Sequence, residues 1–171
     1  MQEGEDPKHL KIAATCKHAF GYSLEGPPPG VPGIDRHHFN AQIEAQDAAD
    51  TYFPPFKRCI ESGKVSQLMC SYNSVNGTPS CVSPTLLTDL VRDQWGFNGT
   101  WVSDCGALSD VYQSHKYLKN ASVTAAAALD AGLDLNCGSV ISKENVQTAL
   151  AKGEVTPERL RLSLRLILIF T

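Results

Sequence analysis

Short apolar runs alternate with longer segments of helical periodicity along most of the 171-residue chain. Apolar runs of this length are typical of buried parallel strands, and the segments between them are typical of crossover helices. The last three runs are spaced at intervals close to the roughly 30 residues of a strand–helix–strand unit. The four predicted strands are Lys11–Cys16, Gln67–Ser71, Thr100–Ser103 and Gly132–Leu135.

Start and stop signals bound the predicted helices. Ser83 and Pro84 supply an N-cap and a first helical residue, and apolar side chains then recur on one face until Gly96. The segment 40–62 is predicted to form two short helices, because Pro54-Pro55 interrupts an otherwise helical pattern. Further helices are predicted over 122–132, over 142–153 and from Thr156 onward.

This alternation predicts an α/β fold, in which the Pro- and Gly-rich stretch 25–33 forms a surface loop. Periodicity alone permits either a small doubly wound sheet or part of a (β/α)₈ barrel. The sequence contains neither a Gly-x-Gly-x-x-Gly motif nor a Walker pattern, so nucleotide binding is not favoured.

Charge and hydropathy argue against nucleic acid and membranes as binding partners. The formal net charge is -3 and the pI is about 5.9, which argues against sequence-independent binding to nucleic acid. No apolar run reaches the roughly 18 residues that a membrane-spanning helix needs, so no membrane partner is expected. The acidic start of the chain lacks the basic and apolar regions of a signal peptide, and none is predicted.

Six cysteines and three sequons bear on the compartment. The cysteine spacings match no zinc-site pattern, and no metal is expected. An even count allows three disulfides, and a turn-rich segment between Cys70 and Cys81 makes that pair a hypothesis. Secretion is weakly favoured over the cytosol. The sequons begin at Asn76, Asn98 and Asn120.

Polar residues follow or end the predicted strands, at the edge where parallel α/β folds place their active sites. Lys17 and His18 follow the first strand, Tyr72 follows the second, and Asp104 follows the third. The fourth segment carries Asp134 and Asn136. Such a cluster suits a neutral ligand rich in hydroxyl groups.

Each candidate also has a simpler interpretation. Asp104 could cap the following helix, and Lys17 could be a Schiff-base nucleophile, a cation that binds a polar substrate, or an ordinary surface lysine. Tyr72 could belong to the core. The pair His37-His38 beside Arg36 is interpreted as a solvated loop cluster, because no further ligand stands at metal-site spacing.

Two longer motifs resemble glycoside hydrolase family three: Met69–Cys81 and Trp101–Ala107. Within that family the chain is similar to the β-xylosidase and α-arabinofuranosidase branch of plants and fungi. The resemblance runs from about Ile12 to Phe170, in order. The further motifs that carry it are Cys16-Lys17-His18, Asp35–Ala41, Gln46–Phe56 and Ala131–Gly138.

This resemblance implies a retaining exo-β-glycosidase that releases xylose or related sugars from the non-reducing ends of xylan- or arabinan-derived oligosaccharides. It implies that Asp104 is the catalytic nucleophile and that Lys17, His18 and Tyr72 bind the sugar. It implies no metal and no organic cofactor. The full-length protein would act outside the cell or in the cell wall.

Departures from the family pattern matter too. Residues 1–171 match the C-terminal half of a (β/α)₈ barrel, about four βα units, and the family's acid/base residue lies in a later domain. No residue here is assigned that role, and the missing barrel half and C-terminal domain are expected partners. An isolated half barrel is expected to be poorly soluble.

The loop after His18 and the sequence Cys105-Gly106-Ala107 also differ from the family pattern, which leaves open whether the sugar is xylose, arabinose or glucose. The alternatives to an enzyme are a non-catalytic carbohydrate-binding protein and a truncated gene product.

Overall fold

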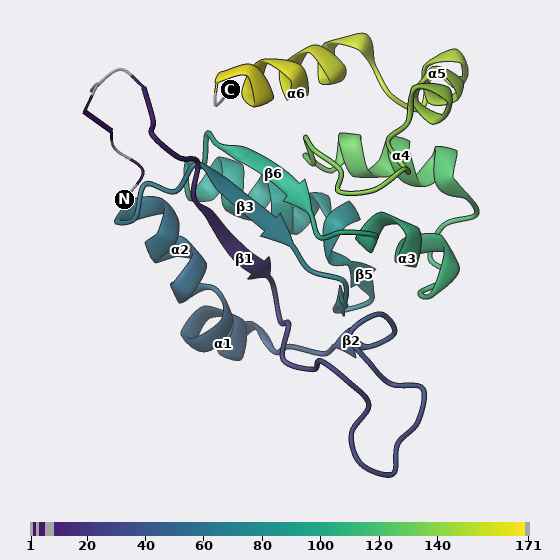
Figure 1. Cartoon of the computed structure of the whole chain (residues 1–171). Helices are drawn as coiled ribbons and strands as arrows, with labels where there is room; N and C mark the ends of the chain where they lie inside the picture. The colour runs from purple at the N-terminus through teal and green to yellow at the C-terminus, as the bar shows by residue number, and fades with distance from the viewer. Residues whose placement is uncertain (1, 3, 6–8, 170–171) are drawn as a thin grey trace.

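Three parallel strands form the central sheet of the computed structural model, which describes residues 2, 4–5 and 9–169. The strands are β1 (Thr15–Ala19), β3 (Gln67–Cys70) and β6 (Thr100–Ser103), in the order β1-β3-β6. Figure 1 shows all three arrows pointing toward the same edge of the sheet. The mixed α/β fold with a parallel sheet is therefore confirmed.

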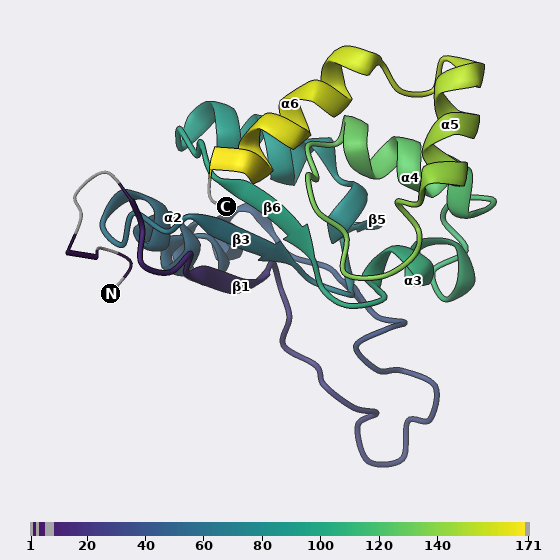
Figure 2. The same cartoon turned by 45° about the horizontal axis from the view of Figure 1, so that its top comes forward.

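Helices connect and cover these strands. Figure 2 shows α4, α5 and α6 together beside β6, the outer strand on one side of the sheet. Helix α2 lies near β1, the outer strand on the other side. In the described part of the chain, no helix is long and apolar enough to cross a membrane. The helices are α1 (Ala45–Asp47), η1 (Ala48–Tyr52), α2 (Pro54–Glu61), η2 (Ser80–Val82), η3 (Thr85–Gln94), α3 (Ala107–Gln113), α4 (Ala121–Asp130), α5 (Lys143–Lys152) and α6 (Pro157–Ile169).

Two predicted strands need correction. The first was predicted over Lys11–Cys16, but β1 starts four residues later and includes Lys17 and His18. The apolar pattern missed this because the end of the strand carries polar side chains. The segment Gly132–Leu135 contributes one isolated parallel bridge, between Leu135 and Val102, and is not a strand of its own.

Most of the helix predictions are confirmed. The π-type helix η3 lies between Pro84 and Trp95 as expected, and α5 begins after Ser142, whose Oγ accepts a hydrogen bond from the Asn145 amide at 3.2 Å. Helix α4 is capped by Asn120 rather than by Ser122. Helix α3 has no counterpart among the predicted helices.

A second, small sheet also escaped prediction. Strands β2 (Asn40–Ala41), β4 (Ser74–Val75) and β5 (Thr78–Pro79) form it in that order, with β2 parallel to β4 and β4 antiparallel to β5. Asn76 and Gly77 make the hairpin turn with positive φ angles of 48° and 92°. Two-residue strands are too short to show an alternating pattern in the sequence.

Aromatic side chains fill much of the core. Phe20 is fully buried and meets the rings of Phe53, Phe56 and Trp95 edge-on, at centroid distances of 5.2, 4.9 and 6.0 Å. Trp101 of β6 is also fully buried, and its Nε1 donates to the Leu87 carbonyl oxygen at 3.2 Å. These contacts join the two outer strands of the sheet, β1 and β6, to the segments that cover them.

Three disulfides reinforce the connections. Cys16 of β1 pairs with Cys59 of α2, Cys70 of β3 pairs with Cys81, and Cys105 pairs with Cys137. The hypothesis that Cys70 pairs with Cys81 is confirmed. Each bond joins a strand, or the loop after it, to a segment further along the chain, and so restricts the chain in the unfolded state as well as in the folded one.

Asp134 lies at the centre of a buried ionic network. Its side chain is completely buried, with Oδ2 at 2.6 Å from Arg92 Nη2 and Oδ1 at 3.2 Å from Arg159 Nη2. The Trp101 amide also donates to Oδ2, at 2.9 Å, and Ser163 Oγ donates to Oδ1 at 3.0 Å. One carboxylate thus joins the end of the apolar segment 132–135 to η3, β6 and α6.

We expect Asp134→Ala to lower the free energy of unfolding by about 3–5 kcal/mol, because it leaves two largely buried guanidinium groups without their shared counter-ion. Urea denaturation measures this change. Asp130→Ala, at the exposed end of α4, is the matched control and should stay within about 0.5 kcal/mol of the wild type. Equal stabilities of the two variants would contradict the central role of Asp134.

Candidate active site

The strand register brings the predicted site residues to one edge of the sheet. Ala19 pairs with Cys70, and Cys70 pairs with Ser103, so β1, β3 and β6 end side by side. The regular register of β1 breaks between Cys16 and Ala19. The Lys17–His18 peptide bond within this segment is cis, and so is the Ala19–Phe20 bond just after it. We call this edge, with the loops that follow the three strands, the rim.

His18 and Asp104 meet at the rim. His18 Nε2 lies 3.0 Å from Asp104 Oδ2, and both side chains are largely buried, at 20% and 15% exposed. The second oxygen of Asp104, Oδ1, accepts a hydrogen bond from the Cys105 amide at 2.7 Å. Both carboxylate oxygens are therefore held in place while lone pairs remain for another partner.

The backbone after Asp104 is fixed as well. Gly106 adopts a left-handed conformation at φ 85° immediately before α3, and its amide donates to the Cys137 carbonyl oxygen at 2.8 Å. The Cys105–Cys137 disulfide joins the same two segments. The interpretation of Asp104 as a cap of this helix is wrong, because the cap position is Gly106 and no side chain caps the helix.

The electrostatics of His18 combine two opposing effects. Burial lowers the pKa of His18 below 6.5 and outweighs the Asp104 carboxylate, which raises it, while Lys17 lowers it further. Neutral His18 is therefore the favoured form near neutral pH, and its Nε2–H can donate to Asp104.

Tyr72 is held beside Asp104. Its side chain is almost fully buried, and its hydroxyl donates to the Cys105 carbonyl oxygen at 2.9 Å. Burial, followed by the nearby Asp104 carboxylate, raises the pKa of Tyr72 to about 12. The phenol therefore stays protonated and remains a hydrogen-bond donor.

Lys17, one residue before His18 in β1, is exposed.

Sequence reasoning missed two rim residues, because it interpreted Arg36 and His37 as part of a solvated loop cluster. Instead, Arg36 Cζ lies 5.0 Å from the centroid of the Tyr72 ring, and the His37 ring lies 4.5 Å from it. His37 also bonds Asp110 of α3. Only His38 fits the expectation, since it bonds Asp35 of its own loop and is about half exposed.

The fourth segment contributes less than its polar residues suggest. Asp134 is committed to the buried network with Arg92 and Arg159, away from the rim. Asn136 lies closer, where its Oδ1 accepts a hydrogen bond from Ser103 Oγ at 3.2 Å. The described residues contain no group of three His, Cys, Asp or Glu side chains that could hold a metal ion.

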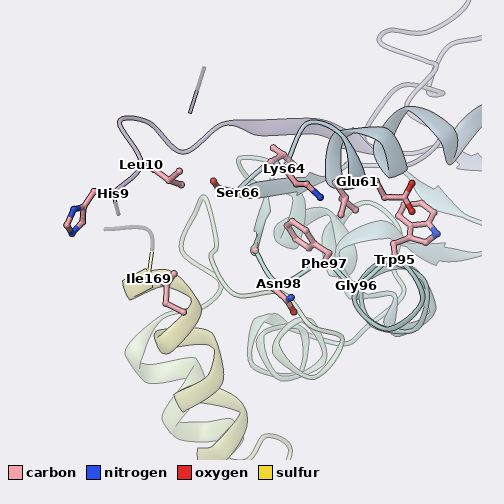
Figure 3. Close-up of a pocket in the computed structure, with 13 residues that line it drawn as sticks. His9, Leu10, Glu61, Lys64, Ser66, Trp95, Gly96, Phe97, Asn98 and Ile169 are labelled. Atoms are coloured by element: carbon pink, nitrogen blue, oxygen red, sulfur yellow. The ribbon is translucent and has the colours of Figure 1, made fainter. Parts of the chain in front are cut away.

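A cavity of about 680 Å³ lies at the other end of the sheet (Figure 3). Its lining includes Ser66 and Gly99, the residues immediately before β3 and β6. It also includes Trp95 and Phe97, which follow η3, and Ile169, the last residue of α6. None of the four predicted site residues lines it. The cavity is therefore separate from the rim.

Comparison with known proteins identifies the family. The family model "Glycosyl hydrolase family 3 N terminal domain" matches residues 1–169. The chain belongs to glycosyl hydrolase family 3. This result confirms the resemblance given by the sequence motifs, which include the one around Asp104.

Individual curated proteins are also similar to this chain. The chain is 48% identical to a probable exo-1,4-β-xylosidase, bxlB, of Aspergillus terreus over 82% of its length, and 46% identical to probable β-D-xylosidase 7 of Arabidopsis thaliana over 86%. These matches cover only 18% and 19% of the two relatives. The chain thus spans about a fifth of the length of these curated relatives.

Solved structures of larger glycosidases share the fold. A GH3 exo-β-xylosidase (XlnD), in complex with a xylobiose aziridine activity-based probe, superposes with a TM-score of 0.89 at 33% identity, covering 99% of this chain and 22% of the other. A β-glucosidase involved in saponin metabolism from intestinal bacteria gives 0.81 at 26% identity, covering 93% and 20%. The path of this chain therefore matches that of a continuous part of larger enzymes.

The contact between His18 and Asp104 predicts that the pKa of His18 depends on the Asp104 carboxylate. We expect Asp104→Asn to lower the pKa of His18 further, because the carboxylate that raises it is removed. NMR titration of the histidine ring signals in the wild type and in Asp104→Asn measures this change. A His18 pKa that stays constant or rises would contradict the pairing.

The lowered pKa of His18 also makes the stability of the fold depend on pH. Because the pKa of His18 is lower in the folded state than its ordinary 6.5, the unfolded chain binds more protons just below pH 6.5. The contribution of His18 to stability is therefore constant above pH 6.5 and decreases as the pH falls from 6.5 through the folded-state value.

Proposed function

We propose that this chain carries the nucleophile of a retaining exo-β-glycosidase of the β-xylosidase type, and that the nucleophile is Asp104. The observation that carries the proposal is the geometry of Asp104. Asp104 directly follows strand β6 of a family 3 sheet, both oxygens of its carboxylate are oriented, and it lies at the rim beside His18 and Tyr72.

In the proposed reaction, an oxygen of Asp104 attacks the anomeric carbon of a β-glycoside and the bond to the leaving oxygen breaks. A covalent glycosyl-enzyme results, which water then hydrolyses. A second carboxyl group, about 5–5.5 Å away, must protonate the leaving oxygen in this mechanism. We assign no residue of this chain to that role and propose that another part of the longer enzyme supplies it.

Lys17 and His18 are proposed to bind hydroxyl groups of the sugar at the non-reducing end. The exposed ammonium of Lys17 is free to turn toward a ligand, and His18 links that position to Asp104. Charge-assisted hydrogen bonds of this kind can strengthen as the transition state forms. The Tyr72 hydroxyl donates its one proton to the Cys105 carbonyl oxygen, and its lone pairs remain able to accept a hydrogen bond near the nucleophile.

The fold is proposed to be the C-terminal half of a (β/α)₈ barrel, completed by the rest of a longer protein. The parallel order β1-β3-β6, with Leu135 bridging to β6, supports this arrangement. Several large apolar side chains remain exposed and would give the rest of the barrel a surface to cover. They include Leu10, Ile12, Leu162, Leu164, Leu168 and Ile169.

An extracellular or cell-wall location and glycosylation are also proposed. Three disulfides suit an oxidising compartment. All three sequon asparagines, at positions 76, 98 and 120, are exposed. The proposed substrates are xylan- or arabinan-derived oligosaccharides, and the names of the xylosidase relatives support the xylan-derived ones.

A 2-deoxy-2-fluoro-β-xylosyl fluoride tests the nucleophile directly. Fluoride leaves without protonation, and the fluorinated sugar accumulates as the covalent intermediate. We expect one sugar adduct on the peptide that contains Asp104, detected by intact mass and peptide mapping. Asp104→Asn should give no adduct, whereas the exposed control Asp130→Asn should react like the wild type.

The outcomes separate the functional alternatives. A folded sample that binds xylose but forms no adduct would refute the nucleophile and favour a non-catalytic carbohydrate-binding protein. The corresponding glucosyl fluoride, tested in parallel, compares the two sugars at the same site.

A further inference from the structure

A chain of hydrogen bonds crosses the rim from α3 to the loop 20–39, which projects from the body of the molecule between β1 and β2 (Figure 1). Asp110 Oδ2 lies 2.7 Å from His37 Nδ1, and Arg36 Nε donates to His37 Nε2 at 3.1 Å. Arg36 Nη1 then donates to Glu25 Oε1 at 2.7 Å. We call the set Asp110, His37 and Arg36 the relay.

The partners of His37 fix its protonation pattern. An arginine side chain only donates, so His37 Nε2 must accept and carry no proton. The proton of the neutral ring is therefore on Nδ1, where it donates to the Asp110 carboxylate. Ser114 Oγ donates to the other oxygen of Asp110 at 2.8 Å, which orients the acceptor.

The relay ends on the ring of Tyr72. The Arg36 guanidinium lies 5.0 Å from the ring centroid, and the His37 ring lies 4.5 Å from it. From the α3 side, His115 Nε2 lies 2.8 Å from the Tyr72 carbonyl oxygen. Tyr72 is thus held by its backbone, by its hydroxyl and by two side chains packed on its ring.

We propose that His37 is a positioning residue: by joining Asp110 to Arg36, it holds both side chains of the loop on Tyr72 and so keeps the Tyr72 hydroxyl beside Asp104. The inference rests on the proposed function, since it assigns a task to residues around the proposed nucleophile. His37 itself acts through Tyr72.

The neighbouring histidine shows what the relay adds. His38 Nδ1 lies 2.6 Å from Asp35 Oδ1, within the same loop, and its side chain is about half exposed. No contact between His38 and α3 or Tyr72 is found among the described residues. His38→Ala is therefore a matched control: the same residue type, one position away, outside the relay.

The first experiment measures the kinetics of Asp104 labelling by the 2-fluoroxylosyl fluoride. We expect His37→Ala and Asp110→Ala each to lower the limiting labelling rate about tenfold, with little change in the half-saturating concentration, because the nucleophile region loses its orientation. The double variant should be no slower than either single variant, since both remove one linkage. Asp110→Asn can still accept from His37 Nδ1–H and should retain most of the rate.

The second experiment does not depend on glycosidase activity. Hydrogen–deuterium exchange followed by mass spectrometry reports on amides 34–39, several of which donate within the loop. We expect exchange there to be about tenfold faster in His37→Ala than in the wild type or in His38→Ala. Circular dichroism confirms that the variants are folded.

Either measurement can overturn the proposal. If the wild type is labelled, a limiting rate of His37→Ala within about twofold of that of His38→Ala refutes the positioning role, even if exchange changes. If the wild type is not labelled, the proposed function fails, and equal exchange in His37→Ala and His38→Ala refutes the relay as well. Loss of rate with faster exchange, confined to the relay variants, supports it.

Discussion

The parallel pairing of β3 with both of its neighbours is the constraint on which the site depends. Backbone hydrogen bonds align the ends of β1, β3 and β6, and residues that are far apart in sequence then share one edge. His18 reaches Asp104 only because of this alignment. A one-residue slip would turn the side chains of a strand to the opposite face of the sheet and separate the pair.

Helix α3 connects the rim to the rest of the fold. It starts just after Asp104 and carries Asp110, and the segment that follows it supplies His115. These two residues hold the 20–39 loop and the backbone of Tyr72. The helix is only 7 residues long, yet Leu108 and Val111 anchor it in the core. A short, well-anchored helix can therefore hold two neighbouring loops in a fixed relation to the carboxylate.

Sequence predicted the parts of the molecule whose signals are local. Thr100–Ser103 is uniformly buried and η3 has one apolar face, so both elements were located well. The apolar pattern did not locate the strand where polar residues occupy its end, as Lys17 and His18 do in β1. It failed again for His37 and Asp134, because their partners come from distant segments and only the folded chain brings the paired side chains together.

The order of the disulfides has a consequence for biosynthesis. The three pairs follow one another along the chain without overlap, so every cysteine bonds the next available one. Six cysteines allow 15 pairings in general. Here the native pairing is also the one that forms if each cysteine is oxidised as soon as its successor emerges during synthesis. The chain can thus acquire its cross-links from the N-terminus onward, without first making bonds that must later be exchanged.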